Sequence, residues 1–138
     1  RHRLRPAPGP DAPPLALDDM PHRLADADLV VCRAGATTLA ELAAAGRPAI
    51  LVPFPFAADD HQRANAEAVR DAGAAVVIED GDLDGARCAA EIAGLALDRP
   101  RRLRMAEASR TLSRPNAAAG IAAVADALLE GKEVPHVP

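Results

Sequence analysis

Three short apolar runs that alternate with helical patterns restrict what this chain can fold into more than any other feature of its sequence. The runs span residues 29–32, 49–52 and 75–79, and helical patterns occupy 37–45 and 61–72 between them. Apolar runs of this length, rich in β-branched residues, are typical of buried strands. Strands that alternate with helices form right-handed βαβ units around a parallel sheet. The sequence therefore predicts an α/β fold.

The remaining helical patterns are expected at residues 18–28, 84–97, 100–111 and 115–131. Pro100 and Pro115 suit the first turn of a helix, where proline loses no hydrogen bond. Three strands make a narrow sheet, because doubly wound domains commonly have about five or six. We infer that strands are missing before Arg1, and we expect a partial Rossmann-like parallel sheet with a helical C-terminal layer.

The domain is expected over residues 17–131. Residues 1–16 are Pro-rich and read as a linker or an extended edge, because proline is excluded from helix interiors and central strands. Residues 132–138 form a tail. With 138 residues the chain is long enough for one core but short for a two-domain enzyme.

Charge and cysteine usage exclude several classes of function. The net charge of −4 and the pI near 5.5 argue against nucleic acid as a partner, because phosphate binding needs a basic surplus. Cys32 and Cys88 lack the spacing of a zinc site or a disulfide framework and are expected to be small buried hydrophobes. No run has the length of a membrane span, and the N-terminus lacks a signal peptide, so a cytoplasmic location is expected.

The most informative segment follows the first expected strand and opens the next helix. It contains Gly35, Ala36, Thr37 and Thr38. The free N–H groups of a helix N-terminus carry partial positive charge and bind diphosphates, and small residues let a ligand approach the backbone. The two threonine hydroxyls are further donors. The sequence predicts an anion-binding turn here.

Glu41, in the same helix, has two interpretations. The spacing Thr38-x-x-Glu41 matches a capping box, in which Thr38 caps the helix and Glu41 bonds back to the Thr38 N–H. Acidic residues in nucleotide-binding α/β domains also accept hydrogen bonds from a ribose diol. The two interpretations predict different exposure of the Glu41 carboxylate.

A second polar segment follows the next expected strand, where His61, Gln62 and Asn65 occupy the first turns of a helix. Open α/β sheets bind ligands at the carboxyl ends of their strands. Gln62 and Asn65 lie three residues apart and share a helix face, so their amides suit sugar hydroxyls. The alternative is that all three are solvated polar residues at a helix start.

Taken together, the two segments resemble the C-terminal domain of the MurG family, which are family 28 glycosyltransferases with the GT-B fold. The resemblance rests on residues 17–20, 27–36, 41–48, 52–54, 61–62, 65–66 and 72–75. Cys32-Arg33 before the glycine is characteristic of this family. Natural-product and plant glycosyltransferases are similar elsewhere, but typically have His-Gly-Gly where this chain has Arg33-Ala34-Gly35.

The resemblance implies a binding site for UDP-GlcNAc with no cofactor and no metal. Uracil would contact backbone groups around Ala16 and Leu17, where the family often has an aromatic residue in place of Ala16. The turn at residues 35–38 would hold the diphosphate, and Glu41 would hold the ribose. The residues facing GlcNAc would be His61, Gln62 and Asn65. Arg33 would either brace the loop or approach the nucleotide.

The resemblance also implies a function for the whole enzyme. The family transfers GlcNAc to lipid-linked MurNAc-pentapeptide, which converts lipid I to lipid II in peptidoglycan synthesis, at the cytoplasmic face of the cell membrane. This chain would be the donor-binding part of that hexosyltransferase. The acceptor domain and the catalytic base have no counterpart here, so the chain alone is expected to be inactive. The alternatives are a free-standing sugar-nucleotide-binding module and the donor domain of another GT-B UDP-glycosyltransferase.

A basic cluster near the C-terminal helices stands apart from these motifs. It consists of Arg99, Arg101, Arg102 and Arg104. Such a cluster either contacts anionic lipid or is a solvated helix face.

Overall fold

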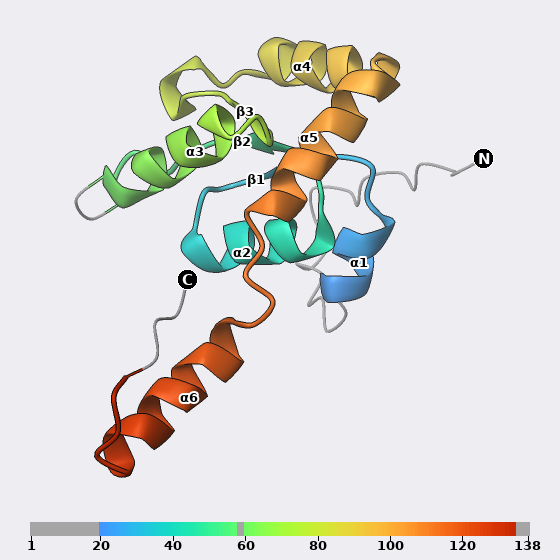
Figure 1. Cartoon of the computed structure of the whole chain (residues 1–138). Helices are drawn as coiled ribbons and strands as arrows, with labels where there is room; N and C mark the ends of the chain where they lie inside the picture. Colours follow the sequence, from blue (N-terminus) through green and yellow to red (C-terminus); the bar gives the residue numbers. More distant parts are fainter. Residues whose placement is uncertain (1–19, 58–59, 135–138) are drawn as a thin grey trace.

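The computed structural model describes residues 20–57 and 60–134 and shows a parallel sheet flanked by helices (Figure 1). The strands are β1 (Val30–Cys32), β2 (Ala49–Leu51) and β3 (Ala75–Val77), and they pair in the order β1-β2-β3. Both pairings are parallel, with Val31 opposite Ile50 and Ile50 opposite Val76. The prediction of an α/β fold with a parallel sheet is confirmed, although each strand is shorter than its apolar run.

Helices connect the strands and then extend beyond them. The helices are α1 (Met20–Asp26), α2 (Ala36–Ala45), α3 (His61–Asp71), α4 (Gly85–Leu97), α5 (Arg99–Thr111) and α6 (Ala117–Leu129). A short 3-10 helix, η2 (Asp80–Asp82), follows β3 and was not expected from the sequence. Within the described residues, no helix has both the length and the apolar character that crossing a membrane requires.

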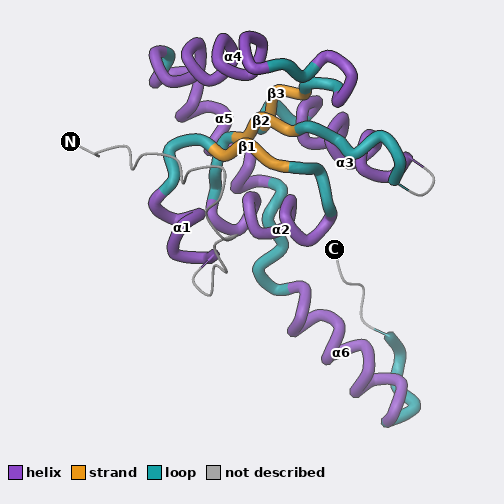
Figure 2. The backbone as a smooth tube through the Cα atoms, turned by 180° about the vertical axis from the view of Figure 1, so that it is seen from behind, coloured by secondary structure: helices purple, strands orange, loops and turns teal. Residues whose placement is uncertain are grey.

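Each face of the sheet has its own core. On one face, Leu24 of α1, Leu42 of α2 and Ala66 of α3 pack with Leu51 of β2. On the other face, the core consists of Ile50, Val52, Ile78, Leu95 and Met105, of which the last two come from α4 and α5. Both views place α2 and α4 on opposite sides of the sheet (Figures 1 and 2). Many of the buried residues are alanines, which allow close packing of the helices on the strands.

Two proline predictions have different outcomes. Pro100 lies in the first turn of α5, as predicted. Pro115 does not lie in α6, because Asn116 is the residue that precedes the helix and Pro115 belongs to the turn before it. The segment 1–16, which was expected to be a linker or an extended edge, lies outside the described residues.

Gly46 ends α2, at a position that a residue with a side chain could not occupy without strain. It has a φ of 61°, in the left-handed region, and its N–H bonds to the Ala43 carbonyl. An added Cβ would lie 2.6 Å from Cγ of Arg110 on α5. Gly73 has a φ of 82°, but there the nearest atom to an added Cβ is 3.9 Å away. The two glycines therefore share a left-handed backbone conformation but differ in how much space surrounds them.

We predict that Gly46→Ala lowers the free energy of unfolding by more than Gly73→Ala does. The left-handed conformation costs about 1–2 kcal/mol for a residue with a Cβ, and only Gly46→Ala must also displace Arg110. Urea denaturation of both variants in the intact protein measures the difference. Equal losses would show that Arg110 moves aside without cost.

Candidate functional site

The segments that follow the three strands meet at the carboxyl edge of the sheet. They comprise residues 33–35 after β1, 52–57 after β2 and 78–82 after β3. Because the strands are parallel, these segments lie at the same edge, which is where open α/β sheets bind ligands. Both polar motifs identified from the sequence are located here.

The N-terminus of α2 presents an open turn at this edge. Gly35 precedes the helix in an extended conformation, with no side chain capping the helix. The first helical bond of this turn runs from the Leu39 N–H to the Gly35 carbonyl, and the N–H groups of residues 36–38 have no acceptor among the described residues. A Cβ added to Gly35 would meet no atom within 4 Å. The backbone donors are therefore accessible to an anion.

The capping-box interpretation of Thr38 and Glu41 is wrong. The helix begins at Ala36, so Thr38 is already its third residue and cannot cap it. Glu41 is exposed and makes no hydrogen bond or ion pair with any part of the chain that the structure describes. Glu41 is the sixth residue of α2, and its carboxylate is available at the surface of that helix. The ribose-binding role of Glu41 stays a prediction.

Gln62 and Asn65 of α3 form hydrogen bonds with the backbone of the segment that follows β1. Oε1 of Gln62 accepts hydrogen bonds from the N–H groups of Ala34, at 3.2 Å, and Phe54, at 3.1 Å. Nδ2 of Asn65 donates to the Ala34 carbonyl at 3.2 Å. Ala34 is fully buried, so these amides satisfy both of its backbone groups. Gln62 thus joins the segments after β1 and β2, and Asn65 joins α3 to the segment after β1, so neither residue is merely solvated.

The same bonds leave part of each amide unused. Two N–H donors fix the Gln62 oxygen, so its NH₂ group must point the other way, and it has no acceptor among the described residues. His61, at the start of α3, is exposed. The sequence correctly located these residues at the edge of the sheet. The sequence did not reveal that Gln62 and Asn65 hold the segment after β1 in place.

Arg33 contacts the segments after β2 and β3. Its Nη1 donates to the carbonyls of Val52 and Pro53, both at 3.3 Å, and lies 2.5 Å from Oδ1 of Asp80. Its Cζ lies 5.6 Å from the ring centre of Phe54, which is within the range of a cation–π interaction. These contacts are those of a brace. Asp80 was not identified from the sequence, since nothing in the pattern of residues 78–82 marks it.

The remaining residues from the sequence analysis are the segment expected to contact uracil and the two cysteines. Leu17, like Ala16, lies outside the described residues. Cys32 and Cys88 are free and half-buried, and burial raises the pKa of the Cys32 thiol to about 11. The Cys32 side chain is therefore a neutral thiol at physiological pH, without the thiolate that a nucleophile or a metal ligand needs. Among the described residues, no three metal-ligating side chains come together.

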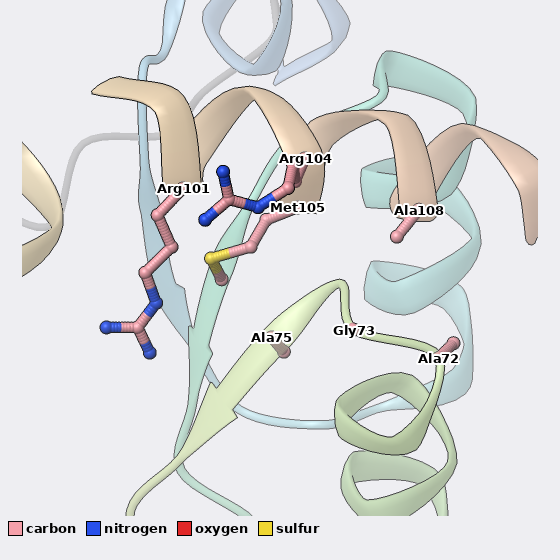
Figure 3. A pocket seen from close by; sticks show the side chains of 7 residues that line it. All are labelled: Ala72, Gly73, Ala75, Arg101, Arg104, Met105 and Ala108. Atoms are coloured by element: carbon pink, nitrogen blue, oxygen red, sulfur yellow. The ribbon is translucent and has the colours of Figure 1, made fainter. Parts of the chain in front are cut away.

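A hollow on the described surface lies at the opposite, amino end of β3 (Figure 3). It has a volume of about 510 Å³ and is lined by Ala72, Gly73, Ala75, Arg101, Arg104, Met105 and Ala108. Its arginines belong to the basic cluster found in the sequence. Arg102 of that cluster is half-buried and has a structural contact, because it donates to the Leu95 and Ala96 carbonyls at the end of α4. The hollow lies away from the α2 turn and the amides of α3.

Comparison with known proteins agrees with this geometry. The family model described as the glycosyltransferase family 28 C-terminal domain matches residues 15–121. The chain belongs to this family. The crystal structure of MurG from Acinetobacter baumannii has a TM-score of 0.68 and 36% identity, over 75% of this chain and 30% of that one. The family 28 resemblance and the fold predicted from it are confirmed.

Two curated relatives of this chain carry the same name. They are called UDP-N-acetylglucosamine--N-acetylmuramyl-(pentapeptide) pyrophosphoryl-undecaprenol N-acetylglucosamine transferase. The relative from Aromatoleum aromaticum is 50% identical over 117 residues, which is 85% of this chain and 32% of the relative. The relative from Anaeromyxobacter sp. (strain Fw109-5) is 56% identical over 108 residues, which is 78% and 28%. The chain thus spans about a third of the length of these relatives.

We predict that Gln62→Ala destabilises the fold, whereas Glu41→Ala does not. Gln62→Ala leaves the buried Ala34 N–H without an acceptor, which costs about 1–3 kcal/mol. Glu41 has no described partner, so its replacement should change the free energy of unfolding by less than about 0.5 kcal/mol. Chemical denaturation of the intact protein measures both. A loss from Glu41→Ala as large as that from Gln62→Ala would mean that Glu41 has a structural role.

Proposed function

We propose that this chain binds UDP-GlcNAc as the donor domain of an inverting glycosyltransferase. The enzyme transfers GlcNAc to lipid-linked MurNAc-pentapeptide, converting lipid I to lipid II in peptidoglycan synthesis. The observation that carries the proposal is the open N-terminus of α2, whose free N–H groups stand beside an exposed carboxylate and two anchored amides. Membership in family 28 and the shared name of the curated relatives support this choice of substrates.

The α2 turn would hold the diphosphate of the donor. The N–H groups of residues 36–38 and the partial positive charge of the helix end favour an anion, and Gly35 leaves room for it. Negative charge builds on the leaving UDP as the bond to the sugar breaks. Donors that are already oriented stabilise this charge without rearranging, so the turn would contribute to catalysis as well as to binding.

The remaining predicted residues would contact the two sugars and the base. Glu41, which lies exposed beside the turn, would accept hydrogen bonds from the ribose hydroxyls. GlcNAc would meet His61, the free NH₂ group of Gln62 and the side-chain oxygen of Asn65. Uracil would contact backbone groups around Leu17. We propose no cofactor and no metal for this site.

We assign no catalytic base to this chain. The displacement requires a sugar hydroxyl of the acceptor to attack the anomeric carbon and to lose its proton, while UDP departs from the opposite face. The acceptor-binding site and the base would come from the portion of the enzyme that the relatives have and this chain does not span. Because the acceptor is lipid-linked, the enzyme would work peripherally on the cytoplasmic face of the membrane.

Binding of UDP-GlcNAc to the intact protein, measured by calorimetry, tests the proposal. We predict that Glu41→Ala weakens this binding by about 10- to 100-fold, because a hydrogen bond to a charged group contributes about 1.5–3 kcal/mol. The melting temperature of the Glu41→Ala variant should equal that of the wild type. Uridine should show the same loss, whereas an unchanged affinity for uridine would remove Glu41 from the ribose site. A wild-type protein that does not bind UDP or UDP-GlcNAc would contradict the proposed function itself.

We also predict that the NH₂ group of Gln62 contributes to the choice of sugar. Gln62→Glu keeps an oxygen for the Ala34 and Phe54 N–H groups but removes the donors. In this variant, kcat/KM for UDP-GlcNAc should fall by a larger factor than the affinity for UDP. The ratio of kcat/KM for UDP-GlcNAc to that for UDP-GalNAc should also become smaller. A lost donor to a sugar hydroxyl corresponds to about 1–3 kcal/mol. Equal losses for UDP and UDP-GlcNAc would leave Gln62 with its structural role alone.

A further inference from the structure

Asp80 and Arg33 form an ion pair that joins all three segments at the carboxyl edge of the sheet. Arg33 follows β1, its carbonyl acceptors on Val52 and Pro53 follow β2, and Asp80 follows β3. The Nη1 to Oδ1 distance is 2.5 Å. None of the ligand contacts proposed above involves Asp80. Among the described residues, the Asp80 carboxylate pairs with Arg33, which lies just before the turn at residues 35–38.

The pair acts through geometry more than through stability. The Arg33 side chain is 49% exposed and that of Asp80 is 34% exposed, and exposed ion pairs contribute little to the free energy of unfolding. However, the guanidinium is planar, and contacts with two carbonyls, a carboxylate and the ring of Phe54 fix its orientation. A brace of this kind can be lost while the fold is kept.

The braced residue adjoins the residues that face the donor. Ala34, which is next in the chain, is fully buried, and both of its backbone groups are held by α3. Gly35 then begins the turn and has no neighbour on its open side. The direction of the α2 N–H groups therefore depends on two anchors, the amides of α3 on one side and the Arg33 side chain on the other.

We propose that Asp80 is a positioning residue for donor binding. It holds the Arg33 guanidinium against the segment after β2 and thereby fixes the turn that presents the α2 N–H groups to the diphosphate. The proposal rests on the function proposed above. It assigns Arg33 the bracing role and not that of a diphosphate ligand.

The two roles for Arg33 predict opposite effects of Asp80. If Arg33 is a brace, removing the Asp80 charge loosens the turn and weakens binding of UDP. If Arg33 binds the diphosphate directly, Asp80 competes for the same guanidinium, and removing its charge strengthens binding of UDP. The sign of the change therefore distinguishes them.

The test is calorimetric titration of UDP into the intact protein and its variants. Asp80→Asn should weaken UDP binding about three- to tenfold, which lies within the range of coupling between residues in contact. Asp80→Glu, which keeps the carboxylate, should recover most of this affinity. Asp82→Asn is the matched control: it makes the same charge change in η2, and Asp82 has no described ion pair. It should alter UDP affinity less than about twofold.

A double-mutant cycle completes the test. Arg33→Ala should weaken UDP binding, and adding Asp80→Asn to it should cause no further loss, because Asp80 acts through Arg33. The melting temperatures of Asp80→Asn and Asp82→Asn should agree, which separates positioning from a general loss of stability. Additive effects, tighter UDP binding by Asp80→Asn, or equal losses from both asparagine variants would overturn the inference. A wild-type protein that does not bind UDP would overturn it together with the proposed function.

Discussion

The burial of β2 on both faces is the constraint on which the other features of the structure depend. Ile50 and Leu51 have no exposed surface, and they belong to opposite cores. A strand without solvent on either face needs a helix layer on each side and a paired strand at each edge. This requirement places α2 and α3 against one face and α4 and α5 against the other. It also brings the loops after all three strands to one edge, so the site is a consequence of how the core is built.

At that edge, residues proposed to bind the donor also hold the loops in place. The oxygen of Gln62 joins two loops, while its nitrogen remains available to a ligand. The side-chain nitrogen of Asn65 donates to the carbonyl of the buried Ala34, and its side-chain oxygen has no hydrogen-bond donor among the described residues. Amides suit this double use because each carries separate donor and acceptor groups. A loop fixed in this way reaches a bound donor with little further ordering, which favours binding.

The two ends of the sheet differ in chemistry. The carboxyl edge presents free N–H groups of α2, an exposed carboxylate and anchored amides, a mixture that suits a ligand with both charged and neutral parts. The amino end carries Arg101 and Arg104 of α5 beside an open hollow (Figure 3). Arg102 is close to Arg101 and Arg104 in sequence but has a different role. Its guanidinium donates hydrogen bonds to carbonyls at the C-terminal end of α4.

The sequence by itself determined the α/β class, the places of the three strands and the turn that begins α2. These features depend on local patterns: apolar runs, glycine and proline positions, and the period of each helix. The pairing of Arg33 with Asp80, the bonds from Gln62 and Asn65 to Ala34, and the failure of the Thr38–Glu41 capping box were decided only by the tertiary structure. Asp80 lies 47 positions from Arg33 in the chain, and Gln62 lies 28 from Ala34. Contacts at such separations depend on how the strands align, and no local pattern in the sequence records that alignment.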